Sequence, residues 1–423
     1  MAVPDSNLAD RSGNLVESHH GLQPRVVFFH YVVAFLLLVL ASGLAYRQIF
    51  KRDIYRESEF HQNQRRTLVP GPRGDIRDRE GRVLVGNRQR LSVVLYLDEL
   101  QTELRRAYSQ IGRNYLASDH QLPSDDTLAE IARVAVVQHY LDQVNALLGR
   151  DERVDRRDLL DHFNRQLLLP YVLVDDLAPE EFARLIEHLP VNSPLQLYTS
   201  SARSYPYGAA AAHTLGSVKL DPDLEADDFP GEDLRTFKMK GTVGRNGLEK
   251  QFDSQLAGEA GGEIFWVDRL GYKTSHPIER RLPRQGKDLV TSLDIDLQLA
   301  AEKTFHDVAQ DKAGAVAAID VRTGEVLALA SEPSYDLNDV SPRISTEKFA
   351  EIEGEGGWSN RAVNGLYPPG STFNILVSIA GLRAGVIDPL DDSIVCTGRL
   401  AIAGRTFVEE HGQEAHGAIA LRQ

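Results

Sequence analysis

The residues best suited to chemistry lie between positions 367 and 385, which read YPPGSTFNILVSIAGLRAG. Two prolines and a glycine predict a rigid turn, after which Ser371 stands where a helix must begin. A serine at the N-terminus of a buried helix can act as a nucleophile, because the unpaired backbone N–H groups and the helix dipole stabilise a developing oxyanion. The same serine can instead cap the helix, since serine is a preferred capping residue.

A nucleophilic Ser371 needs a base within hydrogen-bond reach, and position i+3 of a helix supplies that contact. Asn374 occupies this position, and its neutral amide cannot take a proton as an amine or an imidazole does. The following helix is apolar on nearly all sides, which predicts that it is buried, and Gly385 is placed to end it. The residues alone therefore favour a structural serine.

A second constellation lies farther along the chain. Cys396, Glu409 or Glu410, and His416 offer the sulfur, oxygen and nitrogen ligands that zinc takes. The alternative is an unpaired buried cysteine and a surface histidine. The chain has one cysteine, which excludes an internal disulfide framework, a multi-cysteine zinc finger and an iron–sulfur site.

Composition narrows the function classes. The 423 residues suffice for two or three domains, and 42% hydrophobic with 26% charged residues exclude a fibrous or wholly disordered chain. The 47 Lys and Arg residues are outnumbered by 61 Asp and Glu residues, which gives a net charge of −14. This acidic balance argues against nucleic-acid binding, which needs a basic surface.

Residues 26–46 form a run of 21 residues without a formal charge, long enough for about 30 Å of helix. A cleaved signal peptide is the alternative, but its apolar core usually has only about 7–15 residues, so we favour a retained membrane anchor. Lys and Arg are more frequent after this run than before it. The positive-inside rule alone would therefore place the large C-terminal part in the cytoplasm.

The rest of the chain alternates between sequence patterns typical of helices and patterns typical of short strands. Residues 47–66 predict a polar helical continuation of the anchor, and 123–190 have the apolar spacing of helices. Residues 68–98 and 193–293 have the alternation, Gly and Pro of short strands and turns. From residue 313, two apolar runs joined at Arg322-Thr323-Gly324 predict a β-hairpin.

Segments spread along the chain resemble, in order, the motifs of the class B penicillin-binding proteins, and are nearest to the members that serve cell elongation. NRAVNGLYPPGSTFN (360–374) resembles their active-site segment, in which the serine opens a Ser-x-x-Lys motif. The tripeptide Arg73-Gly74-Asp75 then belongs to the first of these motifs rather than to an adhesion site. The other matching segments are RGDIRDREGRVLVGN (73–87), SYPYGAAAAHTLGSV (204–218), GRNGLEKQFDSQLAGEAGGEIFWVDRLG (244–271), TSLDIDLQLAAE (291–302) and AGAVAAIDVRTGEVLALASEPSYDLN (313–338).

This resemblance implies an α+β multidomain fold with an N-terminal transmembrane helix, an elongated pedestal with a helical head, and a partial α/β serine transpeptidase (penicillin-binding) domain. It also implies a single-pass protein of the bacterial inner membrane with its bulk in the periplasm, against the charge count above. The expected parts are a cytoplasmic tail (1–25), the anchor (26–46), a pedestal or dimerisation-type domain (47–290) with the head inserted near 100–190, and an incomplete transpeptidase domain (291–423).

The implied activity is peptidoglycan D,D-transpeptidation, with Ser371 as the nucleophile that stem peptides and β-lactams acylate. The implied partners are a SEDS-family glycan polymerase and a rod-shape scaffold protein. No cofactor is required, but family members often have a zinc-type ligand set in this stretch, which would here include Cys396, Glu410 and His416.

Two departures from the family pattern predict an impaired or inactive enzyme. Asn374 stands at the position of the motif lysine, where loss of a general base costs about 10²–10⁴-fold in rate. The family's Ser-x-Asn and Lys-Thr-Gly motifs would lie beyond Gln423. One alternative is a catalytically dead scaffold that docks the elongation machinery through residues 26–290. The other, a penicillin sensor or β-lactamase relative, is disfavoured because the pedestal motifs match the synthases.

Overall fold

The computed structural model describes residues 24–51, 63–118, 121–190, 193–226, 229–309, 312–388, 393–408 and 415–420. The chain divides into two compact units. The first unit comprises Met1–Gly208, Leu215–Ser292 and Asp336–Ser345, and the second comprises Ala209–Thr214, Leu293–Tyr335 and Thr346–Gln423.

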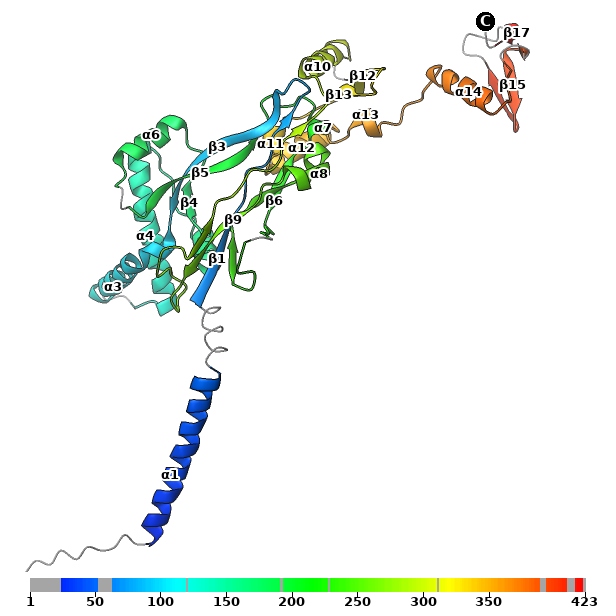
Figure 1. Ribbon diagram of the computed structural model, residues 1–423. Helices are drawn as coiled ribbons and strands as arrows, with labels where there is room; N and C mark the ends of the chain where they lie inside the picture. The colour runs from blue at the N-terminus through cyan, green and yellow to red at the C-terminus, as the bar shows by residue number, and fades with distance from the viewer. Residues whose placement is uncertain are drawn as a thin grey trace, which may run out of the picture. The chain divides into compact units, whose positions relative to one another are not determined.

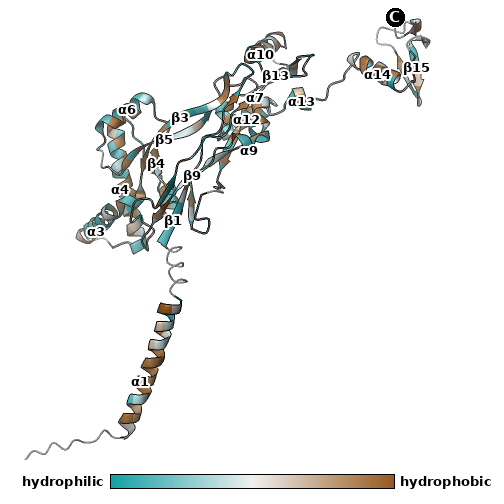
Figure 2. Cartoon of the chain, in the orientation of Figure 1, coloured by the Kyte–Doolittle hydropathy of each residue, from teal (hydrophilic) through white to brown (hydrophobic). Residues whose placement is uncertain are grey.

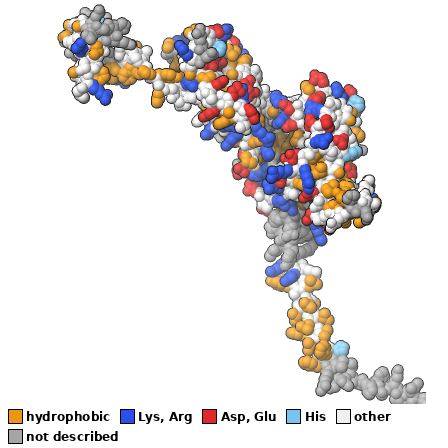
Figure 3. Space-filling view, turned by 180° about the vertical axis from the view of Figure 1, so that it is seen from behind, with side chains coloured by type: hydrophobic (Ala, Val, Ile, Leu, Met, Phe, Trp, Pro, Cys, Tyr) orange, Lys and Arg blue, Asp and Glu red, His pale blue; other side chains and the backbone are white. Residues whose placement is uncertain are grey.

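The N-terminal helix α1 runs from Pro24 to Ala45 and continues into one π-helical turn, η1 (Tyr46–Phe50). Within the described residues, Val27–Ile49 is the one helix long and apolar enough to cross a membrane, and its described side chains face outward with almost no burial (Figures 1 to 3). The expected membrane-length helix is confirmed. The expected helical continuation is wrong from Gln64, where a strand begins, and residues 52–62 lie outside the described residues.

That strand, β1, belongs to a four-stranded sheet with the order β10-β9-β1-β7. It runs antiparallel to β9 and parallel to β7, so long-range pairing decides the structure of this polar segment. Leu68 of β1 packs with Phe229, Leu234 and Ile264 in a small core. The strands are β1 (Gln64–Val69), β7 (Thr236–Lys238), β9 (Gly261–Trp266) and β10 (Glu279–Arg281).

The other large sheet of the first unit has the order β11-β2-β3-β4, with β5 paired to β3. Strand β3 is long because it serves several partners: Gly86 to Leu95 pair antiparallel with Ser204 to Leu195 of β5. The strands are β2 (Ile76–Arg77), β3 (Val83–Leu95), β4 (Tyr171–Val174), β5 (Leu195–Ser204) and β11 (Leu289–Val290).

A helical head covers one end of this sheet (Figure 1). Apolar side chains from the strands, among them Val93 and Leu95, pack with Val137 and Val144 of α4 in the largest core of the unit. The head confirms the helices expected over 123–190, except that Tyr171–Val174 form β4, whose pairing with β3 outweighs the local helical pattern. The head comprises η2 (Leu97–Leu100), α3 (Gln101–Ala117), α4 (Asp125–Leu148), α5 (Arg156–Arg165) and α6 (Pro179–His188).

Short elements complete the first unit, and β6 pairs antiparallel with β8. They are β6 (Val218–Asp221), β8 (Gly241–Gly244), α8 (Gly247–Gln251), α9 (Asp253–Leu256) and α11 (Leu337–Val340).

The second unit contains the predicted hairpin, in which β12 (Gly314–Ile319) pairs antiparallel with β13 (Val326–Glu332). Helix α10 (Ile295–Ala309) is tied to this hairpin by buried Gln298, whose amide exchanges hydrogen bonds with the backbone of Leu329. The remaining elements are α7 (Ala212–Leu215), α12 (Thr346–Gly354), α13 (Arg361–Asn364), α14 (Thr372–Arg383), β14 (Ser393–Cys396), β15 (Arg399–Ile402), β16 (Arg405–Val408) and β17 (Gly417–Ala420).

Candidate active site

The turn before α14 places Ser371 at the N-cap of that helix. Gly370 has a φ of +54°, a left-handed conformation that glycine adopts without steric cost, so the turn depends on the glycine between the prolines and the serine. The Ser371 side chain makes no capping hydrogen bond, whereas the hydroxyl of Thr372 donates to the Pro369 carbonyl. The hydroxyl of Ser371 is exposed at the start of the helix, where a substrate could reach it.

The first amides of α14 are less available than the sequence suggested. The N–H groups of Phe373 and Asn374 donate to the carbonyls of Gly370 and Ser371, both at 3.2 Å. The helix therefore begins with a tight turn of the 3₁₀ type, which satisfies amides that a regular α-helix leaves unpaired. The dipole of the helix still favours negative charge at Ser371.

Asn374 lies one turn after Ser371, as the i+3 spacing predicts, and its side chain is exposed. Its amide makes no side-chain hydrogen bond within the described part of the chain. The structure therefore brings the serine and the asparagine onto the same turn, but this pair contains no group that can accept the hydroxyl proton.

Helix α14 is not buried, which corrects the expectation from its composition. Most of its residues are apolar (Figure 2), and none of them is buried within the described chain. Ile375 is 67% exposed and Leu376 is 59% exposed. An apolar composition of this kind predicts a helix that is packed against other elements, but no described element packs against α14. The helix does end where expected, since Gly385 follows its C-cap with a φ of +65°.

Two of the proposed metal ligands lie together. The antiparallel pairing of β14 with β17 sets Cys396 opposite Gly417, and it brings the Cys396 sulfur to 3.7 Å from Nδ1 of His416. A sulfur and a nitrogen bound to one tetrahedral zinc ion would be about 3.6 Å apart, so this pair fits two ligand positions. Glu409 and Glu410 lie outside the described residues. Within the described residues no group of three potential ligands occurs.

A buried ion-pair cluster ties the first unit together, and residue types alone did not reveal it. Glu249 is fully buried, and its two oxygens accept from Arg73 at 2.8 Å and from Arg203 at 2.6 Å. Arg73 also pairs with Asp253 at 2.8 Å. The available signal was the position of these residues in the Arg-Gly and Gly-Leu-Glu motifs.

The same cluster excludes an adhesion role for the Arg73-Gly74-Asp75 tripeptide. Arg73 is only 3% exposed, so its guanidinium is not available to a receptor. A Cβ atom on Gly74 would lie 2.0 Å from the carbonyl oxygen of Lys287, so the close approach of these two backbones requires glycine.

His213, from the matched segment 204–218, is half-buried in the second unit. Its Nε2–H donates to the Gly357 carbonyl at 2.6 Å, and its ring packs edge-on against Tyr335. Burial lowers the pKa of His213 below its usual value, and the nearby charge of Arg361 adds to this effect. These contacts give His213 a structural role as a neutral hydrogen-bond donor.

Comparison with protein families gives two matches. Residues 68–291, more than half of the chain, match the penicillin-binding protein dimerisation domain. Residues 314–417 match the penicillin-binding protein transpeptidase domain.

Curated relatives agree with these matches. The chain is 27% identical over 368 residues to the peptidoglycan D,D-transpeptidase MrdA of Acinetobacter baumannii, covering 86% of this chain and 48% of the relative. It is 28% identical over 367 residues to MrdA of Escherichia coli, covering 84% of this chain and 51% of the relative. The chain thus spans about half the length of the curated relatives it matches.

Solved structures share the fold. A complex between penicillin-binding protein PBP2 and MreC from Helicobacter pylori matches with a TM-score of 0.59 at 23% identity, over 85% of this chain and 59% of that one. A chain of a peptidoglycan synthase complex that coordinates polymerization and crosslinking matches with a TM-score of 0.52 at 24% identity, over 94% of this chain and 62% of that one.

Proposed function

Because the chain belongs to the class B penicillin-binding proteins, we propose that it serves peptidoglycan D,D-transpeptidation during cell elongation, with Ser371 as an impaired nucleophile. The observation that carries this proposal is the position of Ser371. Its hydroxyl is exposed and uncapped at the start of α14, directly after the Pro-Pro-Gly turn and inside the transpeptidase match.

In the proposed reaction, the Ser371 oxygen attacks the carbonyl carbon of the penultimate D-alanine of a stem peptide. The bond to the terminal D-alanine nitrogen breaks, D-alanine leaves with a proton, and an ester joins the stem to Ser371. An amine of a neighbouring stem then attacks the ester, which forms the cross-link and returns the serine hydroxyl. A β-lactam would stop at the ester stage.

The first step requires a base to take the proton of Ser371, and Asn374 cannot do so. The helix dipole and the exposed hydroxyl support binding and attack, but the proton must pass to water or to the substrate. We therefore expect acylation to be slower by about 10²–10⁴-fold than with a lysine at position 374.

The test is acylation of the full chain in detergent by a fluorescent penicillin over several hours, with Ser371→Ala as the blank. The adduct is located by mass spectrometry of the peptide that contains Ser371. We expect slow labelling that depends on Ser371. Labelling that persists in the Ser371→Ala chain, or no labelling by a chain shown to be folded, would overturn the catalytic proposal.

A second candidate function is a scaffold role, favoured by the buried ion-pair cluster in the first unit. Each charged side chain of that cluster has an ion-pair partner, which stabilises this part of the chain independently of catalysis. The solved relatives form complexes with MreC and within a synthase that polymerizes glycan. By analogy, this chain would bind a rod-shape scaffold protein and a SEDS-family glycan polymerase.

Affinity purification of the tagged full chain from cells tests the scaffold role. Both partners should co-purify equally well with the natural chain and with Ser371→Ala. Reproducible absence of both partners from the natural chain would refute the role.

We propose that Cys396 and His416 hold a structural zinc ion, with Glu410 as a third ligand. Zinc would fasten the β14–β17 pair and supply no chemistry to Ser371. The metal content of the purified chain, measured by mass spectrometry, should be near one zinc per chain and should fall in Cys396→Ser. Equal zinc in both chains would refute the site.

We also propose that α1 anchors the chain in the inner membrane and that the bulk of the chain lies in the periplasm, where peptidoglycan and β-lactams are found. Protease added to intact spheroplasts should digest residues after the anchor. Protection of these residues until the membrane is lysed would show the opposite orientation, the one that the charge count favours.

A further inference from the structure

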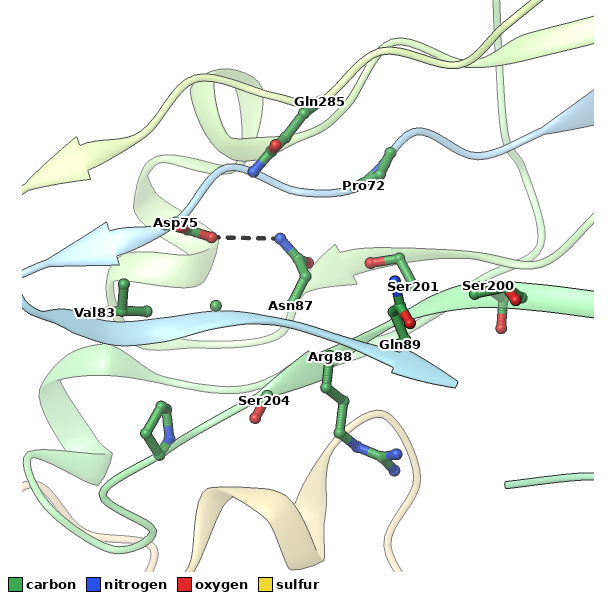
Figure 4. Close-up of a pocket in the computed structure, with 13 residues that line it drawn as sticks. Pro72, Asp75, Val83, Asn87, Arg88, Gln89, Ser200, Ser201, Ser204 and Gln285 are labelled. Carbon is green, nitrogen blue, oxygen red and sulfur yellow. Dashed lines mark hydrogen bonds between the residues drawn. The ribbon is translucent and has the colours of Figure 1, made fainter. Parts of the chain in front are cut away.

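A polar groove lies over the paired strands β3 and β5 of the first unit (Figure 4). It is a hollow of about 550 Å³, with Pro72, Asp75 and Gln285 contributing to its wall. Small-ligand sites usually have volumes of roughly 300–1,000 Å³, so a compact ligand or a short stretch of polymer fits. We call this hollow the β3–β5 groove.

The strand register lines one face of the groove with polar side chains. Gln89 lies directly opposite Ser201, and Asn87 and Thr199 are each two positions away along their strands. Side chains at alternate positions and at opposed positions share a face of the sheet. The register therefore places the amides of Asn87 and Gln89 beside the hydroxyls of Thr199 and Ser201 along the groove.

Most of these groups have unused hydrogen-bonding capacity. Within the described chain, no side-chain hydrogen bond is made by Gln89, Thr199 or Ser201. Amides and hydroxyls both donate and accept, so together they suit a ligand that is rich in the same groups.

The groove carries no unpaired charge. Its charged lining residues are Asp75 and Arg88. Asp75 accepts from Arg77 at 2.7 Å, and Arg88 forms a two-pronged pair with Asp176 at 2.7 and 2.9 Å. An anionic ligand such as a stem peptide with free carboxylates would find no unpaired cation in this groove to compensate for the desolvation of its charge. A neutral ligand does not have this desolvation cost.

The wall of the groove is held by the buried cluster. The amides of Asn87 and Gln285 both donate to the Arg73 carbonyl, at 2.7 and 3.3 Å, and the Arg73 guanidinium is fixed by Glu249. Side chains held in this way bind with less loss of conformational freedom.

We propose that the β3–β5 groove binds a short stretch of neutral, N-acetylated glycan strand. The proposal rests on the proposed function, because the groove would bind the glycan strand whose stem peptides Ser371 would cross-link. Hydroxyls and acetamido groups of the sugars match the Gln89 amide and the Thr199 and Ser201 hydroxyls, and the neutrality of the sugars matches the paired charges of the groove. The facing main-chain N–H and C=O groups of β3 and β5 are paired with each other, so a peptide strand could not be added between the two strands.

The test is saturation-transfer NMR of the full chain in detergent micelles with the β-1,4-linked tetramer of N-acetylglucosamine, a neutral saccharide without a stem peptide. We expect transfer to the N-acetyl methyl groups. In Gln89→Ala/Ser201→Ala, the Kd should rise about 5- to 30-fold, as expected for two lost hydrogen bonds. The matched control is Ser109→Ala/Gln110→Ala, which removes the same side-chain types from exposed positions of α3 and should leave the Kd unchanged.

Three results would overturn the proposal: no transfer from the natural chain, an equal loss in both double variants, or transfer to a soluble stem pentapeptide in place of the saccharide. Penicillin acylation of the natural chain is measured on the same sample. Saccharide binding without acylation would count against the catalytic proposal alone, and acylation without saccharide binding would count against the groove alone.

Discussion

The ion-pair cluster of the first unit and the start of α14 in the second unit treat their polar groups in opposite ways. Glu249 is fully buried and binds two arginines, and Arg73 has a second carboxylate partner in Asp253. Ser371 and Asn374 are exposed, and neither side chain makes a hydrogen bond within the described chain. The first region pairs its charged side chains with one another, whereas in the second the backbone alone positions the reactive group.

The largest effect should come from supplying the missing base. Ser371 would then have a side-chain partner, as the charged residues around Glu249 already do. In Asn374→Lys the rate of acylation by fluorescent penicillin should rise about 10²–10⁴-fold, because an amine can accept the hydroxyl proton. Position 374 is exposed, so a longer side chain fits. Asn374→Gln is the control and should not change the rate. Equal rates in the lysine and glutamine variants would show that the base does not limit acylation.

Removal of Glu249 should destabilise the first unit strongly, because its ion-pair cluster is buried. Glu249→Ala leaves Arg73 and Arg203 buried without their carboxylate, which should cost about 3–5 kcal/mol in the free energy of unfolding of the first unit. The matched control is Glu259→Ala, because Glu259 is 73% exposed and pairs with an exposed arginine at 3.6 Å. We expect the control to change the free energy by no more than about 1 kcal/mol. Denaturant unfolding monitored by circular dichroism measures both, and similar values would contradict the cluster's role.

Truncation of a leucine to alanine should destabilise the chain strongly in the core of the first unit and very little in α14. Leu100 is completely buried, so Leu100→Ala should lower the free energy of unfolding by about 2–5 kcal/mol. Leu376 in α14 is 59% exposed, and Leu376→Ala should stay within about 0.5 kcal/mol of the natural chain. Thermal unfolding of both variants measures the difference. A large loss in Leu376→Ala would mean that α14 is covered in solution.

The smallest effect concerns pH. The pKa of His213 is lower in the folded chain than in the unfolded one, so the unfolded state takes up the proton first as the pH falls. The Tm of the second unit should therefore decrease modestly from pH 7.5 to 5.5. In His213→Gln, which keeps a hydrogen-bond donor, this part of the decrease should disappear. An unchanged pH dependence in the variant would show that His213 does not contribute to it.

Local patterns predicted the elements whose signals are local. The uncharged run of residues 26–46 predicts α1, the turn at Arg322-Thr323-Gly324 predicts the β12–β13 hairpin, and the apolar spacing of residues 123–190 predicts α4. Each signal lies within the element that it specifies, so no distant partner is needed to recognise it.

Features that depend on distant partners were not predictable from such patterns. Arg73 and Glu249 are 176 residues apart, and no periodicity links an arginine to a carboxylate over that distance. The polar segment at Gln64 becomes a strand because β7 and β9 pair with it. At the candidate site, the spacing correctly put Ser371 and Asn374 on one helical turn, but composition could not tell whether α14 is covered.

The long separation between Arg73 and Glu249 has a consequence for the making of the protein. At about 5–20 residues per second, a ribosome needs roughly 10–35 s to add the 176 residues between them. During that time Arg73 lacks Glu249, its buried partner in the folded chain, and its guanidinium must stay hydrated. The first unit therefore closes late in synthesis, and a pause before Glu249 would prolong the period in which its unfinished sheets are exposed to aggregation.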